Sequence, residues 1–238
     1  VFDASVSGHA FTFGALAGLK DFALSDSEGT PITLSVGKNN ASTSYSGVIS
    51  GGGSLVKQGT GTLSLSGANS FSGGSILTAG SALTANNLQA LGLGPVVNNG
   101  TLNLAMSPGV YSGLSVALSG AGTNNVTLVT GVPGSSTTLS GDYSGFTGVW
   151  NIGVGAAASV NRVLMNGKDN PAASIFVRSN ATLYASTAIR HDAALTLLGG
   201  NTGESYGQLR LENSSIWAGP ILLAGPMTDS ADGLIGCN

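Results

Sequence analysis

The residues able to do acid–base chemistry are few and widely spaced in this 238-residue chain. Glycoside hydrolysis needs two carboxylates that face each other across a groove. Most of the acids instead lie in sequences typical of turns, such as SDSEG, GKDNP and TDSADG, which favours solvated turn residues. The eleven acids are Asp3, Asp21, Asp26, Glu28, Asp142, Asp169, Asp192, Glu204, Glu212, Asp229 and Asp232.

Arg190-His191-Asp192 is the densest ionisable cluster. Adjacent strand residues point to opposite faces, so only Arg190 and Asp192 can share a face, where they fit a surface ion pair as well as a site. The other histidine, His9, lies far away in sequence, and no set of His, Cys, Asp and Glu has metal-ligand spacing. We therefore predict no catalytic residue, no metal ligand and no cofactor.

The remaining motifs have ordinary interpretations. Asp229-x-x-Asp232-Gly233 is faintly calcium-like but lacks periodic acidic ligands, so we interpret it as a turn. Gly51-Gly52-Gly53 is not followed by the Gly-Lys-Ser/Thr of a phosphate loop. Cys237 is the single cysteine, which excludes an internal disulfide; we favour an unpaired residue over an intermolecular bridge or lipid attachment. Chance explains the Asn-x-Ser/Thr sequons, among them those at Asn40, Asn125, Asn180 and Asn213.

Composition narrows the class of protein. Charged residues make up 8% of the chain, against about 25% in ordinary soluble domains, while hydrophobic residues reach 42%, too many for a disordered tail. The net charge is −3 without any basic run, which argues against nucleic-acid binding. No apolar run approaches the ~18–20 residues needed to span a bilayer, so we predict no transmembrane segment. The chain begins with Val1, and we expect it to be processed or part of something longer.

Short alternating runs bounded by Gly, Asn, Asp or Pro indicate β-strands. Ile32, Leu34 and Val36 fall on one face of such a run, with Thr33 and Ser35 on the other. The same alternation pairs Leu63 with Leu65 and Leu102 with Leu104. Helical patterns are weak, and residues 86–92 are expected to form at most one helical turn.

The pattern recurs along the chain. LSGANSFSGG at residues 65–74 resembles LSGDYSGFTG at 139–148, a shift of 75 at the phenylalanine, and a third copy lies at 209–225. Each copy would hold about three coils of roughly 20–30 residues. We predict one β-solenoid over residues 1–238: N-terminal coils at 1–44, the clearest repeat at 45–104, a diverged second repeat at 105–186 and a truncated third at 187–238.

These repeats predict an all-β fold, a β-solenoid with Gly/Asn-rich turns. One strand-turn unit cannot bury its apolar face alone, but stacked coils form a continuous apolar column. Gly and Asn tolerate the left-handed conformations needed at the corners. An antiparallel sandwich is the alternative, but Asn-Gly and Asp-Gly loops do not punctuate regular strand pairs here.

Residues 45–104 resemble the autotransporter-associated β-strand repeat, also called the passenger-associated transport repeat. The similarity rests on GSLVK at 53–57, GTGTL at 59–63, LSGAN at 65–69, FSGG at 71–74, Ala79-Gly80, ALG at 90–92 and NNGTL at 98–102. The resemblance implies a right-handed parallel β-helix in a large exported protein of a bacterium with an outer membrane, secreted or on the cell surface. The family has no catalytic motif, so the resemblance transfers no residue roles.

We therefore expect a structural segment of a surface protein: a rod, stalk, adhesin shaft or extracellular fibre, and not an enzyme. The alternatives are a carbohydrate- or host-binding module and, less favoured, a polysaccharide-degrading enzyme. Phe71, Phe146 and Trp217 recur at one position and are predicted to stack inward, whereas Tyr143 and Trp150 are better candidates for exposed aromatics. Unpaired strand edges at the solenoid ends predict axial self-association.

Overall fold

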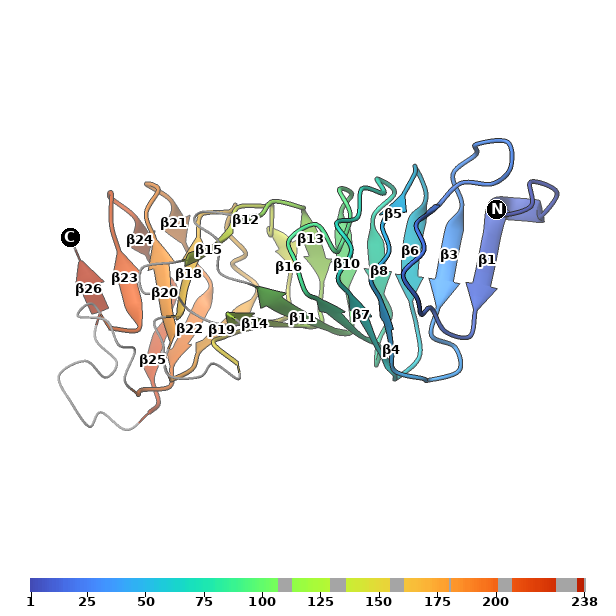
Figure 1. The fold of residues 1–238 in the computed structure, drawn as a ribbon. Helices are drawn as coiled ribbons and strands as arrows, with labels where there is room; N and C mark the ends of the chain where they lie inside the picture. Colours follow the sequence, from blue (N-terminus) through green and yellow to red (C-terminus); the bar gives the residue numbers. More distant parts are fainter. Residues whose placement is uncertain are drawn as a thin grey trace. The chain divides into compact units, whose positions relative to one another are not determined.

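The computed structural model describes residues 1–106, 113–128, 136–154, 161–179, 181–200, 207–225 and 235–237. Every pair of named strands within this part of the chain is parallel, and the only helical element is a short 3-10 turn, η1 (Ser7–His9). The chain divides into two compact units, Val1–Leu104 and Ala105–Asn238. Each unit is a stack of parallel coils, so the predicted β-solenoid fold is confirmed (Figure 1).

The first unit stacks its strands in two sheets and a short third side (Figure 1). Leu34, Leu55 and Ser75 are register partners in one sheet, and Leu63 and Leu83 in the other, so successive coils take 20 or 21 residues. One sheet contains β1 (Ala10–Phe13), β3 (Thr33–Val36), β6 (Ser54–Lys57), β8 (Ser75–Leu77) and β10 (Val96–Asn98); the other contains β4 (Thr43–Tyr45), β7 (Thr62–Leu65), β9 (Ala82–Ala85) and β11 (Thr101–Met106); β2 (Phe22–Ala23) pairs with β5 (Ile49–Ser50).

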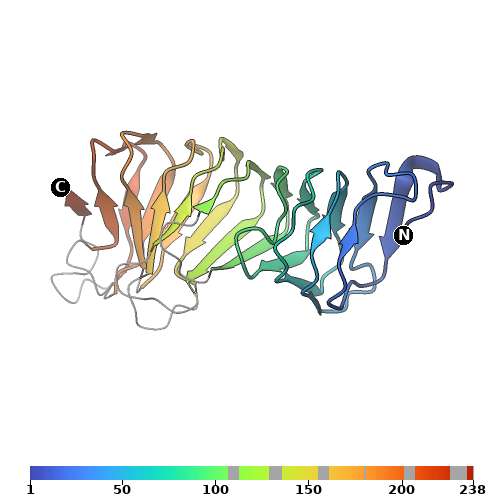
Figure 2. The same ribbon diagram turned by 45° about the horizontal axis from the view of Figure 1, so that its top comes forward.

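The second unit repeats this plan with longer coils (Figure 2, green to red). Thr123, Val149, Ser174 and Ala194 are successive partners, which gives coils of 26, 25 and 20 residues. Its strands are β12 (Gly113–Leu114), β15 (Ser136–Leu139), β18 (Asn161–Met165), β20 (Ala181–Ala185), β23 (Leu209–Leu211) and β26 (Ile235–Cys237); β14 (Thr123–Leu128), β17 (Val149–Ile152), β19 (Ser174–Val177), β22 (Ala194–Leu197) and β25 (Ile221–Leu223); β13 (Leu118–Gly120) with β16 (Gly145–Phe146); and β21 (Arg190–His191) with β24 (Ile216–Trp217).

The predicted alternation is confirmed. Ile32, Leu34 and Val36 are buried, whereas Thr33 and Ser35 are half-buried on the other face. Leu63 and Leu65 in β7, and Leu102 and Leu104 in β11, are likewise buried. Residues 86–92 form a hydrogen-bonded turn rather than a helix, since the Gly92 N–H donates to the Gln89 C=O.

Glycine occupies the corners where one coil touches the next. A side chain at Gly73 would collide with the backbone of Gly53, and one at Gly148 with the carbonyl of Gly122. Both glycines lie two residues after the recurring phenylalanine of the sequences at 65–74 and 139–148, so they mark the same contact in the two units. The recurrence therefore reflects a packing requirement of stacked coils.

The middle of each recurring sequence holds a buried polar group. The Asn69 amide accepts the Ile49 N–H at 2.8 Å and donates to the Ala90 C=O at 2.7 Å. At the corresponding position, the Tyr143 hydroxyl accepts the Gly141 N–H at 3.0 Å and donates to the Leu114 C=O at 2.7 Å. Each side chain thus forms hydrogen bonds with backbone groups that the strand ladder leaves without partners inside the coil.

Two predictions about aromatic residues were wrong. Tyr143 and Trp150 are fully buried and pack edge-to-face, because both fall at inward positions of the coil. Phe71 and Phe146 are buried as expected, but Trp217 in β24 is partly exposed. The second unit therefore fills the centre of its coils with a Tyr143–Trp150–Phe146 cluster.

The buried Tyr143 hydroxyl provides a test of this arrangement. We expect Tyr143→Phe to lower the free energy of unfolding by about 1–3 kcal/mol, because it leaves the buried Gly141 N–H without an acceptor. Urea unfolding followed by circular dichroism measures the change. The partly exposed Tyr184 serves as the control, since Tyr184→Phe should cost less; equal costs would contradict the assignment.

Candidate functional site

Three of the described carboxylates, those of Asp142, Asp192 and Glu212, form ion pairs with Lys or Arg side chains. Asp142 lies 3.1 Å from the Lys168 ammonium, and Glu212 pairs with Arg210. Hydrogen bonds from the Ser144 hydroxyl and amide, together with Lys168, lower the pKa of Asp142 to about 2. Within the described ranges, no cluster of three or more His, Cys, Asp or Glu side chains could hold a metal ion. These contacts favour surface ion pairs over an acid–base couple.

Of the two interpretations left open by the sequence, the structure shows the surface ion pair: Arg190 and Asp192 lie 2.8 Å apart on the outer face. His191 points inward and is 1% exposed, with Nδ1 3.5 Å from Asp169 and its ring stacked on Trp217 at 5.0 Å. Burial lowers the pKa of His191, although Asp169 and Asp192 act in the opposite direction. The imidazole is therefore a neutral core ring beneath Trp217.

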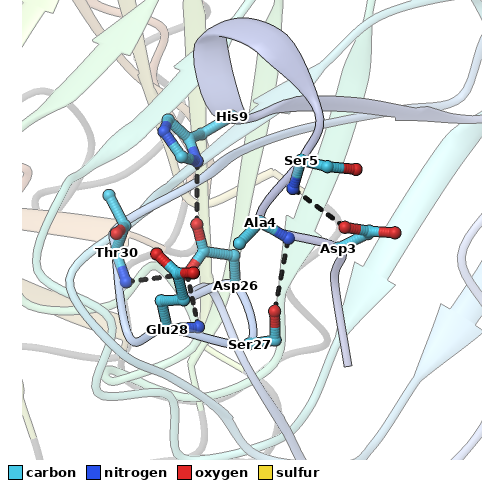
Figure 3. Close-up of polar contacts among 8 residues, drawn as sticks. All are labelled: Asp3, Ala4, Ser5, His9, Asp26, Ser27, Glu28 and Thr30. Atoms are coloured by element: carbon cyan, nitrogen blue, oxygen red, sulfur yellow. Dashed lines mark hydrogen bonds and ion pairs between the residues drawn. The ribbon is translucent and has the colours of Figure 1, made fainter.

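Asp26 is the acid whose surroundings differ most from the sequence-based expectation (Figure 3). Its side chain lies in the predicted turn, but it is buried rather than solvated. One carboxylate oxygen accepts the N–H groups of Glu28 and Thr30, both at 2.9 Å, and the other lies 2.8 Å from His9 Nδ1. Burial raises the pKa of Asp26, but the two amides and His9 outweigh it, so the net shift is downward.

A carboxylate that orients an imidazole is also part of many hydrolytic sites, in which the imidazole activates a serine hydroxyl. The contacts of the nearby hydroxyls therefore decide whether Asp26 and His9 resemble such a site. The Ser27 hydroxyl accepts the Ala4 N–H at 3.3 Å, and the Ser27 N–H donates to the Phe2 C=O at 2.8 Å (Figure 3). These contacts tie residues 1–9 to the turn that begins at Asp26. The cluster is thus a strap that holds the N-terminal segment on the first coils.

An apolar cavity of about 580 Å³ lies beside this strap. Phe2 packs on Phe11 with ring centroids 4.7 Å apart, and Phe22 packs edge-to-face on Tyr45 at 5.6 Å. The cavity is lined by Val1, Phe2, Asp3, Phe11, Phe13, Leu16, Ala17, Gly18, Leu19, Lys20, Asp21, Phe22 and Tyr45. Most of these side chains are apolar, and the titratable groups among them are Asp3, Lys20, Asp21 and Tyr45.

Lys57 is a buried charge that sequence reasoning missed. It is 1% exposed, and its ammonium donates to the carbonyls of Gln58 at 2.7 Å and Gly59 at 3.1 Å. Burial lowers the pKa of Lys57. The period-2 pattern of SLVK places Leu55 and Lys57 on the same inward face, which is the signal that could have identified it.

Several sequence-based candidates have structural roles or lie outside the described part. Gly51 adopts a positive φ of 93° and packs on Leu24, so the glycine run is a corner. Asn40 and Asn213 adopt positive φ, and the amide of Asn151 donates to Asn125 at 2.9 Å. The side chain of Cys237 and the residues Asn180, Glu204, Asp229 and Asp232 lie outside what the structure describes.

The comparison with protein families concerns a segment of the first unit. Residues 55–81 match the model of the Passenger-associated-transport-repeat family. The predicted resemblance is confirmed for this segment, which runs from β6 to the turn before β9. Searches of curated proteins and of solved structures found no match. Among the described residues, no helix is both long and apolar enough to cross a membrane.

Protonation of His191 should weaken the fold. Burial depresses the pKa of His191 in the folded state. Near the ordinary histidine pKa of about 6.5 the unfolded chain therefore binds more protons than the folded chain, so the free energy of unfolding decreases as the pH is lowered. We expect the unfolding free energy of His191→Phe, measured relative to that of the unchanged protein, to be higher at pH 5 than at pH 7.5. Urea titrations at both pH values test this. A relative loss instead would mean that Asp169 and Asp192 dominate.

The Asp26 strap predicts a local effect. Asp26→Ala removes the acceptor of two amides and the partner of His9, and should cost about 3 kcal/mol in the first unit. Hydrogen exchange should rise at residues 1–30. The control is Asp3→Ala, since Asp3 is exposed and its carboxylate accepts the N–H of the nearby Ser5 at 2.8 Å. Equal protection in both variants would contradict the strap.

Proposed function

We propose that this chain is a structural β-solenoid segment of an exported bacterial surface protein. The match of residues 55–81 to the passenger-associated repeat supports export to the surface of a bacterium with an outer membrane. Within that role, the segment would act as a stalk, adhesin shaft or fibre that holds neighbouring parts of the protein in place.

One observation carries the proposal: in the matched segment, recurring residues build the coil. Its inward side chains are Leu55, Lys57, Leu63, Leu65, Asn69, Phe71 and Leu77, and each is buried. Gly59, Gly61 and Gly67 each lie against backbone of the preceding coil. The repeat therefore uses its characteristic residues for packing, and this favours a structural role.

The alternatives have less support. A carbohydrate-binding module would be favoured by exposed aromatic side chains, but Tyr143 and Trp150, the candidates for exposed aromatics, are buried and unable to stack on a sugar. A polysaccharide-degrading enzyme needs facing carboxylates, whereas Asp142, Asp192 and Glu212 contact cations. A host or glycan ligand remains a proposal for the loops alone.

Removing one whole coil tests the structural role. Leu55 is the register partner of Ser75, and Leu65 that of Ala85, so deleting residues 55–74 removes one 20-residue coil and restores both ladders. The chain would be placed between a signal peptide and an outer-membrane translocator, with an epitope tag. We expect surface display of the tag to persist after this deletion.

The matched control deletes residues 55–64, which shifts the chain by half a coil and should abolish folding and display. Loss of display with the whole-coil deletion, when the purified variant is folded, would contradict a purely structural role. Specific binding of the unchanged chain to a polysaccharide, abolished by the same deletion, would favour the carbohydrate-binding alternative.

A further inference from the structure

We propose that the contact between β21 and β24 is an acid-sensitive seam: at acidic pH the segment that carries β24 separates from β21, while β22 and β25 of the same coils stay paired (Figure 1). The seam comprises residues 188–193 and 213–219, all of which the structure describes. The proposal goes beyond the proposed function, because it assigns a conformational response to one side of the second unit, whatever the cellular role of the chain.

The seam has a shorter strand ladder than the sheets on either side of it. β21 and β24 pair over two residues, whereas the same two coils pair over three residues in β22 with β25 and in β20 with β23. Across the seam, the Ile216 N–H donates to the Ile189 C=O at 3.0 Å, and the Ala218 N–H donates to the His191 C=O at 2.7 Å. Because segments held by few backbone hydrogen bonds open at a low free energy, the seam is the part of these coils expected to open first.

His191 is the titratable group inside the seam. Its side chain is 1% exposed, and its ring stacks on Trp217 with the ring centroids 5.0 Å apart. Among the described residues, Nε2 has no hydrogen-bond partner, and Nδ1 lies 3.5 Å from Asp169, beyond the ordinary length of a hydrogen bond. A charged ring at this site would be buried without compensating hydrogen bonds, which is costly. Opening the seam would give the ring access to water, so opening and proton uptake are coupled.

The charged groups that face His191 come from two directions. Asp169, in the loop before β19, lies on the Nδ1 side, and its other carboxylate oxygen accepts the Asp192 N–H at 2.9 Å. Asp192 follows His191 in the chain and pairs with Arg190 at 2.8 Å. From the third direction, that of β24, residues 213–219 contribute no charged side chain. Burial lowers the pKa of His191 although both aspartates act in the opposite direction, so the closed seam favours the neutral ring.

The direction of the response follows from the coupling between proton binding and opening. In the open seam His191 would titrate near the ordinary histidine pKa of about 6.5, whereas burial lowers its pKa in the closed seam. As the pH falls below the ordinary value, the open form binds more protons than the closed form, and the equilibrium constant for opening rises. Between pH 7.5 and pH 5.5 the rise is at most about tenfold, the ratio of protonated to neutral ring for an ordinary histidine one pH unit below its pKa.

Hydrogen exchange followed by mass spectrometry at pH 7.5 and pH 5.5 tests the seam, after correction for the intrinsic pH dependence of exchange. The reporting segment is 213–219, which donates the hydrogen bonds across the seam. The internal reference is segment 194–198, where the Leu195 N–H donates to the Pro220 C=O at 2.9 Å and so joins the same two coils within a sheet.

Two variants separate His191 from other titrating groups. His191→Phe keeps an aromatic ring against Trp217 but binds no proton, and His191→Leu replaces it if circular dichroism shows that the phenylalanine variant is not folded. His9→Phe is the matched control, because His9 is the other histidine of the chain and lies in the first unit.

We expect the protection of residues 213–219 to fall by about three- to tenfold at pH 5.5 in the unchanged chain and in His9→Phe, with the reference segment unchanged. In His191→Phe the protection of residues 213–219 should be the same at both pH values. Equal protection of the seam at both pH values in the unchanged chain would overturn the proposal, and so would an equal loss in the reference segment, because the two coils would then open together. The same fall in His191→Phe would assign the response to another group and would also overturn it.

Discussion

Every feature of each unit depends on the stacking of one parallel coil on the next. Neighbouring strands lie about 4.8 Å apart, so a corner that crosses another corner has room for backbone and little else. Gly73 against Gly53 and Gly148 against Gly122 meet this limit in the two units. The same spacing brings inward side chains into columns, where Leu34 and Leu55 contact in register. Coil length, composition and burial all follow from this one contact.

Stacking also determines which polar groups enter the interior. The corner between two sheets leaves backbone N–H and C=O groups without ladder partners, and water cannot reach them there. Asn69 and Tyr143 solve this problem with different chemistry at corresponding positions, and Gln208 does so in the second unit by donating to the Arg178 C=O at 3.0 Å. Such residues look functional in a sequence, because they are polar and recurrent, yet their role is to complete the coil.

Local sequence rules predicted the fold, but they failed where contacts between coils determine which side chains are buried. Period-2 alternation identified the inward leucines of β7 and β11, and the glycine-rich corners identified a solenoid. It could not place Tyr143 and Trp150, since a one-residue difference in phase moves an aromatic ring between core and surface. The pairing of His9 with Asp26 joins segments 17 residues apart through a turn and a strap, and no local pattern encodes it.

Specific chemistry is hard to build on a coil of this type. Each inward residue must match the column, each corner must stay small, and the outward rows contact their neighbours above and below, as Asn151 contacts Asn125. Only the loops escape these constraints. Within the described residues, an apolar cavity of about 580 Å³ lies beside the first coil, where Phe2 packs on Phe11. Recognition by this fold is therefore expected outside the regular ladder of strands.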